Sequence, residues 1–216
     1  FPVQIVLLLF MCALLVAPNA FAVGPGNVTT GLDLWFKANL ETSTTTDGAA
    51  VSTWGDQSVN NTDASAVGGA EPTYYGATHA NAINYNPTLV FDGTTDYMTH
   101  DDSNMTISSL PRSFLYVGSL NATPATGADV FYSYGNGAAG NKVSLDTSGT
   151  SARLFGNGNR LTATGGTFSA TIPYLGIGRF FSNLDASMDF NGRPGTTTAG
   201  VSGGLSTNNA SFDGFI

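Results

Sequence analysis

Cysteine and charge are scarce in this sequence of 216 residues. The single cysteine, Cys12, lies within the first 22 residues, so residues 23–216 cannot form a disulfide among themselves. Charged residues make up only 10% of the chain, and its seven lysines and arginines are scattered rather than clustered. The formal net charge is −8. Because proteins bind phosphate backbones with clustered basic side chains, we expect no nucleic-acid partner.

Glutamate and histidine, which supply much of the acid–base and metal chemistry of enzymes, are also rare. Glu41 and Glu71 fall in predicted loops, and no predicted strand carries two acidic residues at i, i+2 spacing. A glycosidase needs two carboxylates that flank the scissile bond. The histidines, His79 and His100, cannot complete a tetrahedral zinc site unless acidic residues join them. We therefore expect a protein that is not an enzyme.

The long hydrophobic run of this chain lies at its start. Val3–Val16 is almost entirely apolar, which is too short to span a bilayer but typical of a signal-peptide core. Asn19-Ala20-Phe21-Ala22 follows, with small residues at the positions that signal peptidase reads. We expect residues 1–22 to be a signal peptide whose start is incomplete, with a retained membrane anchor as the competing interpretation. The mature domain is then secreted or held at the cell surface after bacterial export, without membrane insertion.

Residues 23–216 have no sustained helical period. Short apolar or alternating runs are instead separated by Gly, Asn, Asp and Ser, which indicates β-strands joined by tight turns such as Asn191-Gly192. Residues Asp56–Ala82, rich in Asn, Ser, Gly and Ala, are predicted to be one long loop. The predicted strands are Leu32–Ala38, Val51–Trp54, Thr88–Phe91, Tyr97–Thr99, Ser113–Leu120, Val130–Tyr134, Lys142–Leu145, Arg153–Phe155, Thr167–Thr171, Tyr174–Phe181, Ser187–Phe190 and the start of a further one at Phe212–Ile216.

Aromatic residues in and beside the predicted long loop are candidates for ligand recognition. They are Trp54, Tyr74, Tyr75 and Tyr85. Aromatic faces stack on the apolar faces of sugar rings, and neighbouring Asn and Asp side chains can bind hydroxyl groups. The alternative is a structural role, in which the two adjacent tyrosines pack the loop down and Trp54 is buried in the core.

Oxygen-bearing side chains gather in two short segments that suggest a calcium site. Asp56, Asn60 and Asp63 lie close together in sequence, and Asp92 and Asp96 flank a Gly-Thr-Thr turn. Calcium takes several oxygen ligands from carboxylates, amides and backbone carbonyls on loops. Ca²⁺ is thus the cofactor that these residues suggest. The alternative is that the side chains only cap turns through hydrogen bonds to the backbone.

Four segments, in this order, carry a resemblance to a known family. Gly31–Ala38 resembles the pattern LxLWLKAD, Val51–Asn61 the pattern VxxWxDxSGNGN, Asn86–Met98 the pattern PxxxFDGxxDYL, and Met188–Gly192 a strand that ends in Asn-Gly. The second segment departs from its pattern, because Val59 stands where the pattern has Gly. Together they resemble the laminin-G-like jelly-roll domains of bacterial exported surface proteins, in the concanavalin A-like lectin/glucanase superfamily. Phe212–Ile216 resembles the start of the last strand of such domains.

The resemblance implies an all-β fold, a two-sheet antiparallel jelly-roll sandwich over residues 23–216 that is C-terminally incomplete, with its last strand truncated. It also implies a calcium site near the rim of the sandwich. Enzymes of this superfamily carry Glu-x-Asp-x-(x)-Glu on one strand, which this sequence lacks. We therefore expect an exported, non-catalytic module for binding or adhesion, whose partner is a glycan or a surface protein, within a longer multidomain chain. The alternatives are a polysaccharide-active hydrolase or lyase on the same fold, and a structural spacer in a longer surface protein.

Overall fold

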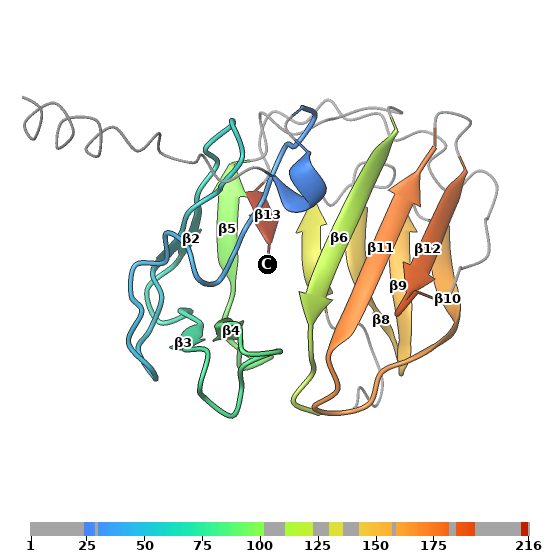
Figure 1. Ribbon diagram of the computed structural model, residues 1–216. Helices are drawn as coiled ribbons and strands as arrows, with labels where there is room; N and C mark the ends of the chain where they lie inside the picture. The colour runs from blue at the N-terminus through green and yellow to red at the C-terminus, as the bar shows by residue number, and fades with distance from the viewer. Residues whose placement is uncertain are drawn as a thin grey trace, which may run out of the picture.

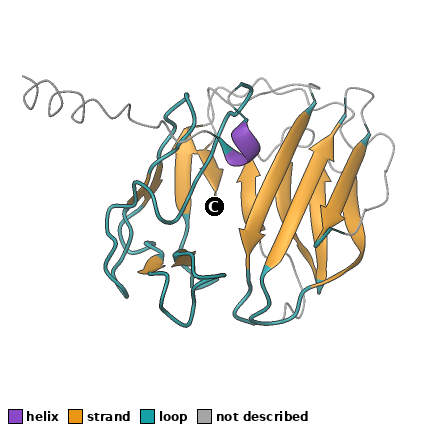
Figure 2. Ribbon diagram, in the orientation of Figure 1, coloured by secondary structure: helices purple, strands orange, loops and turns teal. Residues whose placement is uncertain are grey.

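The computed structural model describes residues 24–28, 30–101, 111–122, 130–135, 143–156, 159–181, 185–192 and 213–215. The predicted signal peptide, residues 1–22, lies outside them. The described residues are all-β, as predicted: the 3-10 turn η1 (Pro25–Asn27) is their helical element, and the rest are strands and loops (Figure 2). No helix among them has the length and apolar character needed to cross a membrane.

The strands form antiparallel sheets arranged in two layers. Their bounds are β1 Thr53–Trp54, β2 Ala64–Ala66, β3 Thr73–Tyr75, β4 Thr88–Val90, β5 Met98–Asp101, β6 Arg112–Gly118, β7 Val130–Tyr134, β8 Val143–Ser148, β9 Ser151–Gly156, β10 Asn159–Thr167, β11 Tyr174–Phe180, β12 Ala186–Phe190 and β13 Asp213–Phe215. One sheet has the order β1-β2-β5-β13-β7-β8-β9-β10, another the order β12-β11-β6, and β3 pairs with β4. Figure 1 shows β6, β11 and β12 in front of β8, β9 and β10, an arrangement compatible with a β-sandwich.

Alternation of side chains along β6 and β11 separates a core face from an outer face. In β11, Tyr174 and Phe180 are buried, whereas Leu175 is exposed. In β6, which pairs with β11 over its whole length without a register shift, half-buried and exposed positions alternate from end to end. A period of two is what a strand produces when one face of its sheet is covered.

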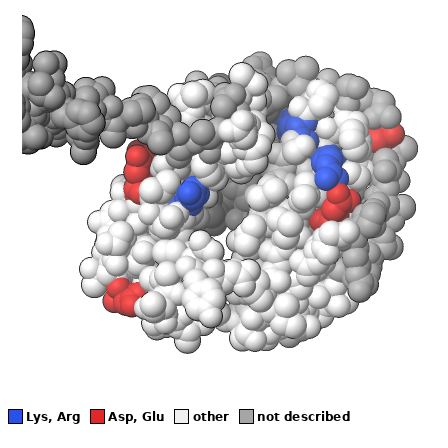
Figure 3. Space-filling model, viewed as in Figure 1, with Lys and Arg blue, Asp and Glu red and all other residues white. Residues whose placement is uncertain are grey.

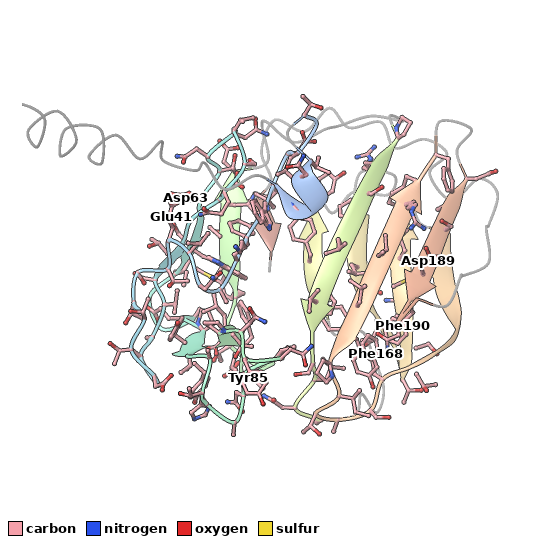
Figure 4. All side chains as sticks on the ribbon, in the orientation of Figure 1. Glu41, Asp63, Tyr85, Phe168, Asp189 and Phe190 are labelled. Carbon is pink, nitrogen blue, oxygen red and sulfur yellow. The ribbon has the colours of Figure 1, made fainter. Side chains whose placement is uncertain are left out.

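The main hydrophobic core lies between the two layers. Some of its aromatic rings meet edge to face: Phe168 packs against Phe190 with ring centroids 5.0 Å apart, and Phe114 against Phe180 at 6.1 Å. Tyr174 instead stacks on Phe190. Figure 4 shows Phe168 and Phe190 side by side at the lower end of the sheets. Edge-to-face pairs add stability beyond the area that they bury. The buried members of this core are Tyr134, Leu145, Ala152, Leu154, Phe168, Tyr174, Phe180, Ala186, Met188 and Phe190.

A glycine on the core face of β11 sets how closely the layers approach. A Cβ atom on Gly178 would lie 2.9 Å from Cδ1 of Leu154, which is fully buried in β9 of the facing sheet. Real Cβ atoms essentially never make contacts under 3.0 Å, so the missing side chain makes room for the leucine. Gly176, on the same face of β11, would meet only Met188, at 3.8 Å.

A second cluster packs the N-terminal half and meets the main core at His100. The buried His100 donates from Nδ1 to the carbonyl oxygen of Asp101 at 3.2 Å, and its Nε2 lies 3.2 Å from the hydroxyl of Tyr132. Its ring is parallel to that of Tyr132 and also contacts Phe36. The imidazole therefore contacts both Phe36, which packs on the second cluster, and Tyr132, which packs on the main core. The buried members of the second cluster are Val51, Ala64, Tyr74 and Met98.

Strands β8 and β9 bury an ion pair. Arg153 donates from Nε to Oδ1 of Asp146 at 2.5 Å, and the hydroxyl of Ser144 donates to Oδ2 at 3.0 Å. Arg153 and Asp146 lie directly opposite each other in the ladder. Because a buried charge left without its partner is strongly destabilising, the pair opposes any slip in the register of these two strands.

The predicted strand at Leu32–Ala38 does not form, since the segment makes only an isolated bridge to Asp56. Side chains satisfy several of its backbone groups, beside one backbone bond from the N–H of Gln57 to the carbonyl of Trp35 at 2.8 Å. The N–H of Trp35 donates to the Asp56 carboxylate, and the carbonyl of Asp33 accepts from the hydroxyl of Ser58. Hydrogen bonds from side chains to the backbone compete with ladder pairing, and here they replace it.

The prediction of one long loop over Asp56–Ala82 was also wrong, because β2 and β3 lie inside it. The sequence of β2 is Ala-Ser-Ala, whose small side chains give no clear hydrophobic alternation. The structure shows that Ala64 is buried and Ser65 is exposed. In the C-terminal half, the predicted strand Thr167–Thr171 is replaced by β10, which ends at Thr167. β10 is composed largely of Thr, Gly and Asn, so its pairing with β9 was not evident from hydrophobic pattern.

We expect Gly178→Ala to lower the free energy of unfolding by about 1–3 kcal/mol, the usual cost of overpacking a core. The added methyl group must displace the side chain of Leu154. Gly176→Ala is the matched control, because the same change there meets ordinary contacts, and we expect it to cost less. Urea denaturation measures both. Equal losses in the two variants would contradict the role of Gly178 as the point of close approach.

Candidate functional site

Asp56, a predicted calcium ligand, organises the chain around it. The residue is 2% exposed, and its carboxylate accepts four hydrogen bonds. Oδ1 accepts from the N–H of Trp35 and of Ser58, each at 2.8–2.9 Å. Oδ2 accepts from the hydroxyl of Ser58 at 2.6 Å and from the N–H of Thr62 at 2.9 Å. A carboxylate offers about four lone-pair sites, so all of them are occupied.

The other two candidate ligands of this segment are also engaged. Asp63 accepts from the N–H of Asp56 at 2.9 Å, and the side-chain amide of Asn60 donates to the carbonyl of Asp33 at 3.0 Å. These contacts hold residues 55–63 against the coil that precedes β1.

Asp92 plays the same part in the turn after β4. Its Oδ1 accepts from the N–H groups of Thr94, Thr95 and Asp96, and its Oδ2 accepts from both threonine hydroxyls. Asp96 in turn accepts from the N–H of Asp92 at 2.9 Å. The pKa of the Asp92 carboxyl is held well below its ordinary value, because the backbone N–H of Asp96, followed by those of Thr95 and Thr94, donates to the charged form.

The geometry of both segments matches turn formation. Calcium would have to displace the donors that fill the carboxylates of Asp56 and Asp92. Among the described residues, no three His, Cys, Asp or Glu side chains gather in a metal-binding arrangement. The hydrogen bonds of Asp56 and Asp92 therefore favour the turn-capping alternative over a calcium site, and a calcium titration decides between the two.

Two of the four predicted aromatic ligand residues belong to the protein interior. Tyr74 is 5% exposed in the second cluster, so it has no free ring face for a ligand. Trp54 is half-buried against the same cluster, and its indole N–H donates to the carbonyl of Lys37 at 2.9 Å. Its ring contacts Phe36, with centroids 5.0 Å apart. The placement of Tyr74 and Trp54 fits the alternative to ligand binding, in which these side chains pack the protein interior.

Tyr75 and His79 form a stacked pair at the end of β3. Their ring centroids are 4.1 Å apart and their planes differ by 22°. Nδ1 of His79 lies 3.1 Å from the N–H of Asn81, which can only donate, so Nδ1 accepts. In the neutral ring the proton then sits on Nε2, which makes that atom a hydrogen-bond donor.

Tyr85 stands at the tip of a tight hairpin between β3 and β4. Ile83 and Asn86 exchange two backbone hydrogen bonds, of 3.1 Å and 2.9 Å. Between them Asn84 and Tyr85 have φ values of 49° and 59°, as a type I′ turn requires. Tyrosine is uncommon at positive φ, and here its side chain is 89% exposed. Figure 4 shows Tyr85 at the lower end of the N-terminal half.

An open depression of ≈ 410 Å³ lies beside this hairpin. Asp, Glu, Lys and Arg are absent from its lining, so its polar chemistry is that of a hydroxyl, an amide, an imidazole and a phenol. Its lining residues are Ala77, Thr78, His79, Ala82, Asn84 and Tyr85. Two predicted ligand residues, Tyr75 and Tyr85, are thus found at or beside one surface.

Comparison with family models, with curated proteins and with solved structures finds no match for this chain. The resemblance carried by Gly31–Ala38 and the later segments therefore stays a prediction from the sequence. The candidate site accordingly rests on the geometry of the hairpin and of the depression beside it.

His79 and Asn84 are the site residues that sequence reasoning missed. A signal for Asn84 was present, since two asparagines flank Tyr85 and asparagine tolerates left-handed backbone. His79 had none, because its place under Tyr75 depends on how the loop after β3 folds back.

We expect millimolar calcium to leave the melting temperature of the metal-stripped protein unchanged. A ligand that binds only the native state raises the melting temperature, but the carboxylates of Asp56 and Asp92 are already saturated by donors. Differential scanning fluorimetry with calcium, and with magnesium as control, makes the measurement. A rise specific to calcium would establish the predicted site.

We expect Asp92→Asn to lower stability at neutral pH and to matter less as the pH falls. The folded-state pKa of Asp92 is depressed, so its stabilising contribution is complete above the ordinary carboxyl pKa of about 3.9 and is lost as the pH drops through the folded value. Melting temperatures of both proteins between pH 7 and acid conditions test this. Asp96→Asn, which keeps an oxygen for its single backbone partner, is the control with the smaller expected effect. A difference in melting temperature between the unaltered protein and Asp92→Asn that does not change with pH would contradict this prediction.

Proposed function

We propose that this chain is an exported, non-catalytic binding or adhesion module on a concanavalin A-like, laminin-G-like jelly roll, with a glycan or a surface protein as its ligand. The four ordered sequence segments support the family, and antiparallel sheets in two layers suit it. Low charge and the run Val3–Val16 support export and a ligand recognised without strong electrostatic steering.

The presentation of Tyr85 is the observation that carries the proposal. A bulky aromatic residue is exposed at the tip of a turn whose backbone disfavours it. Residues in strained backbone persist where they serve a purpose, and they cluster at ligand sites. The depression beside it adds the amide of Asn84 and the imidazole of His79. An exposed aromatic ring beside an amide and an imidazole suits the faces and hydroxyls of a sugar or the surface of a protein.

The alternatives make different demands on the chain. A glycoside hydrolase needs two carboxylates free to act on one bond, and the oxygens of the buried Asp56 already accept four hydrogen bonds. Release of reducing sugar from polysaccharides would establish that alternative. A structural spacer needs no ligand, so a glycan array and a surface-extract pull-down that both stayed empty would favour it.

We expect Tyr85→Asn to abolish ligand binding while the melting temperature stays equal or rises. Asparagine tolerates the left-handed backbone that tyrosine strains to adopt, so the change relieves strain as it removes the ring. Binding is read on an array of immobilised glycans and in the pull-down. Val59→Ala, a change at an equally exposed residue of another loop, is the control and should bind as the unaltered protein does. Unchanged binding by the Tyr85 variant would refute the assigned site.

A further inference from the structure

We propose that the depression beside the Tyr85 hairpin binds an uncharged saccharide, one that carries neither carboxylate nor sulfate. Thr78, His79 and Asn84 recognise its hydroxyl groups, while the ring of Tyr85 packs on a sugar face. This inference rests on the proposed function, because it concerns the same site. It narrows the ligand from a glycan or a surface protein to one chemical class, and it assigns the groups that recognise that class.

The polar side chains that line the depression keep their hydrogen-bonding capacity for a ligand. Within residues 30–101, no hydrogen bond engages the hydroxyl of Thr78, the side-chain amide of Asn84 or the phenol of Tyr85. Asn86, which lies just outside the lining, is used differently: its amide donates to two backbone carbonyls of the hairpin, at 3.3 Å and 2.9 Å. The groups that hold the turn together and the groups that line the depression are therefore different.

The imidazole of His79 is held in a fixed orientation by its neighbours. Its Nδ1 accepts from the N–H of Asn81 at 3.1 Å, which leaves Nε2 as the donor. Its ring stacks on Tyr75 with centroids 4.1 Å apart, and Tyr75 itself lies outside the lining. Tyr75 is thus a positioning residue, which acts on a ligand only through the imidazole. The site gains an N–H group that a sugar hydroxyl oxygen can accept from.

Hydroxyl groups are the ligand groups that this lining fits. A sugar hydroxyl both donates and accepts, as do the hydroxyl of Thr78 and the amide of Asn84. The volume of ≈ 410 Å³ lies in the range of small-molecule sites, roughly 300–1,000 Å³. A protein partner would favour another setting, because its anchoring side chains fill well-packed, desolvated pockets. This depression is open, and apart from Tyr85 its apolar lining consists of Ala77 and Ala82.

The distribution of charge disfavours acidic glycans. Lys and Arg are absent from the lining, so a carboxylate or sulfate would find no cation there. Figure 4 labels Tyr85 at the lower end of the N-terminal half, and Figure 3, in the same orientation, shows no Lys or Arg on that end and an acidic side chain at its outer margin. The formal net charge of −8 also repels anions at longer range. An uncharged saccharide meets neither penalty.

An array of immobilised oligosaccharides tests the class of ligand. It carries gluco-, galacto- and manno-oligosaccharides, together with forms of each that bear uronic acid or sulfate. We expect the full chain to bind only uncharged members, and the affinity for the best of them to change less than about twofold between low and high salt, because no ion pair contributes. Binding confined to acidic members and abolished by Tyr85→Asn would overturn the inference and leave the proposed function in place.

Asn84→Gly tests the recognition of hydroxyl groups. Glycine adopts the φ of 49° without strain, so the hairpin keeps its turn while the amide is lost. Loss of one hydrogen bond should weaken binding of the best array glycan about three- to tenfold, measured by isothermal titration calorimetry. Asn61→Gly is the matched control, since Asn61 is also exposed, at a φ of 51°, but lies in another loop, and it should bind as the unaltered protein does. Equal weakening in the two variants would contradict the role of Asn84.

Two further results separate failure of this inference from failure of the proposed function. A protein captured through Tyr85 in the surface-extract pull-down, with no glycan bound on the array, would overturn the saccharide and keep the binding site. An empty array together with an empty pull-down would overturn both.

Discussion

Contact between the two layers is the constraint on which the rest of this structure depends. Residues 23–216 contain no cysteine, so apolar and aromatic packing must hold the sheets together without a covalent link. Burial of apolar surface contributes about 25 cal/mol per Å², and each edge-to-face aromatic pair adds about 0.5–1.5 kcal/mol. The layers reach contact distance because β11 presents glycine where β9 presents Leu154. A small residue facing a large one is how two flat surfaces interlock at the density of a protein interior.

Carboxylates take over where regular strand pairing stops. Asp56 collects donors from two separate stretches of chain, Trp35 in one and Ser58 and Thr62 in the other, and Asp92 closes its own turn with five hydrogen bonds. Each carboxylate replaces several backbone partners that a sheet would otherwise supply. The long N-terminal coil is ordered in this way without being a strand. The backbone of the same coil bonds β3, since the N–H of Gly48 donates to the carbonyl of Tyr74 and the N–H of Tyr74 donates to the carbonyl of Ala49, each at 2.9 Å.

Charge is scarce at the surface that we assign to ligand binding. The depression at the hairpin has no Asp, Glu, Lys or Arg in its lining. Recognition there depends on shape, stacking and hydrogen bonds rather than on electrostatic steering. Tyr85 contributes an exposed aromatic ring, and Thr78 and Asn84 contribute hydrogen-bonding groups.

Features that depend on neighbours in sequence were predictable from the chain alone. The all-β character followed from short runs with a period of two, and the Asn191-Gly192 turn has the two positive φ angles that this dipeptide favours. Tyr75 and Tyr85 were found as candidates because they are aromatic residues in turn-rich sequence.

Features that depend on distant partners were decided by the tertiary structure. Leu32–Ala38 has a strand-like pattern, yet the Asp56 carboxylate and the Ser58 hydroxyl bond its backbone groups. In the same way Tyr74 and Tyr75 are equivalent in sequence, and only the pairing of β3 with β4 sends one ring into the core and the other to the surface. A local pattern sets what a segment is able to do, whereas the groups that reach it across the fold decide which possibility has the lowest free energy.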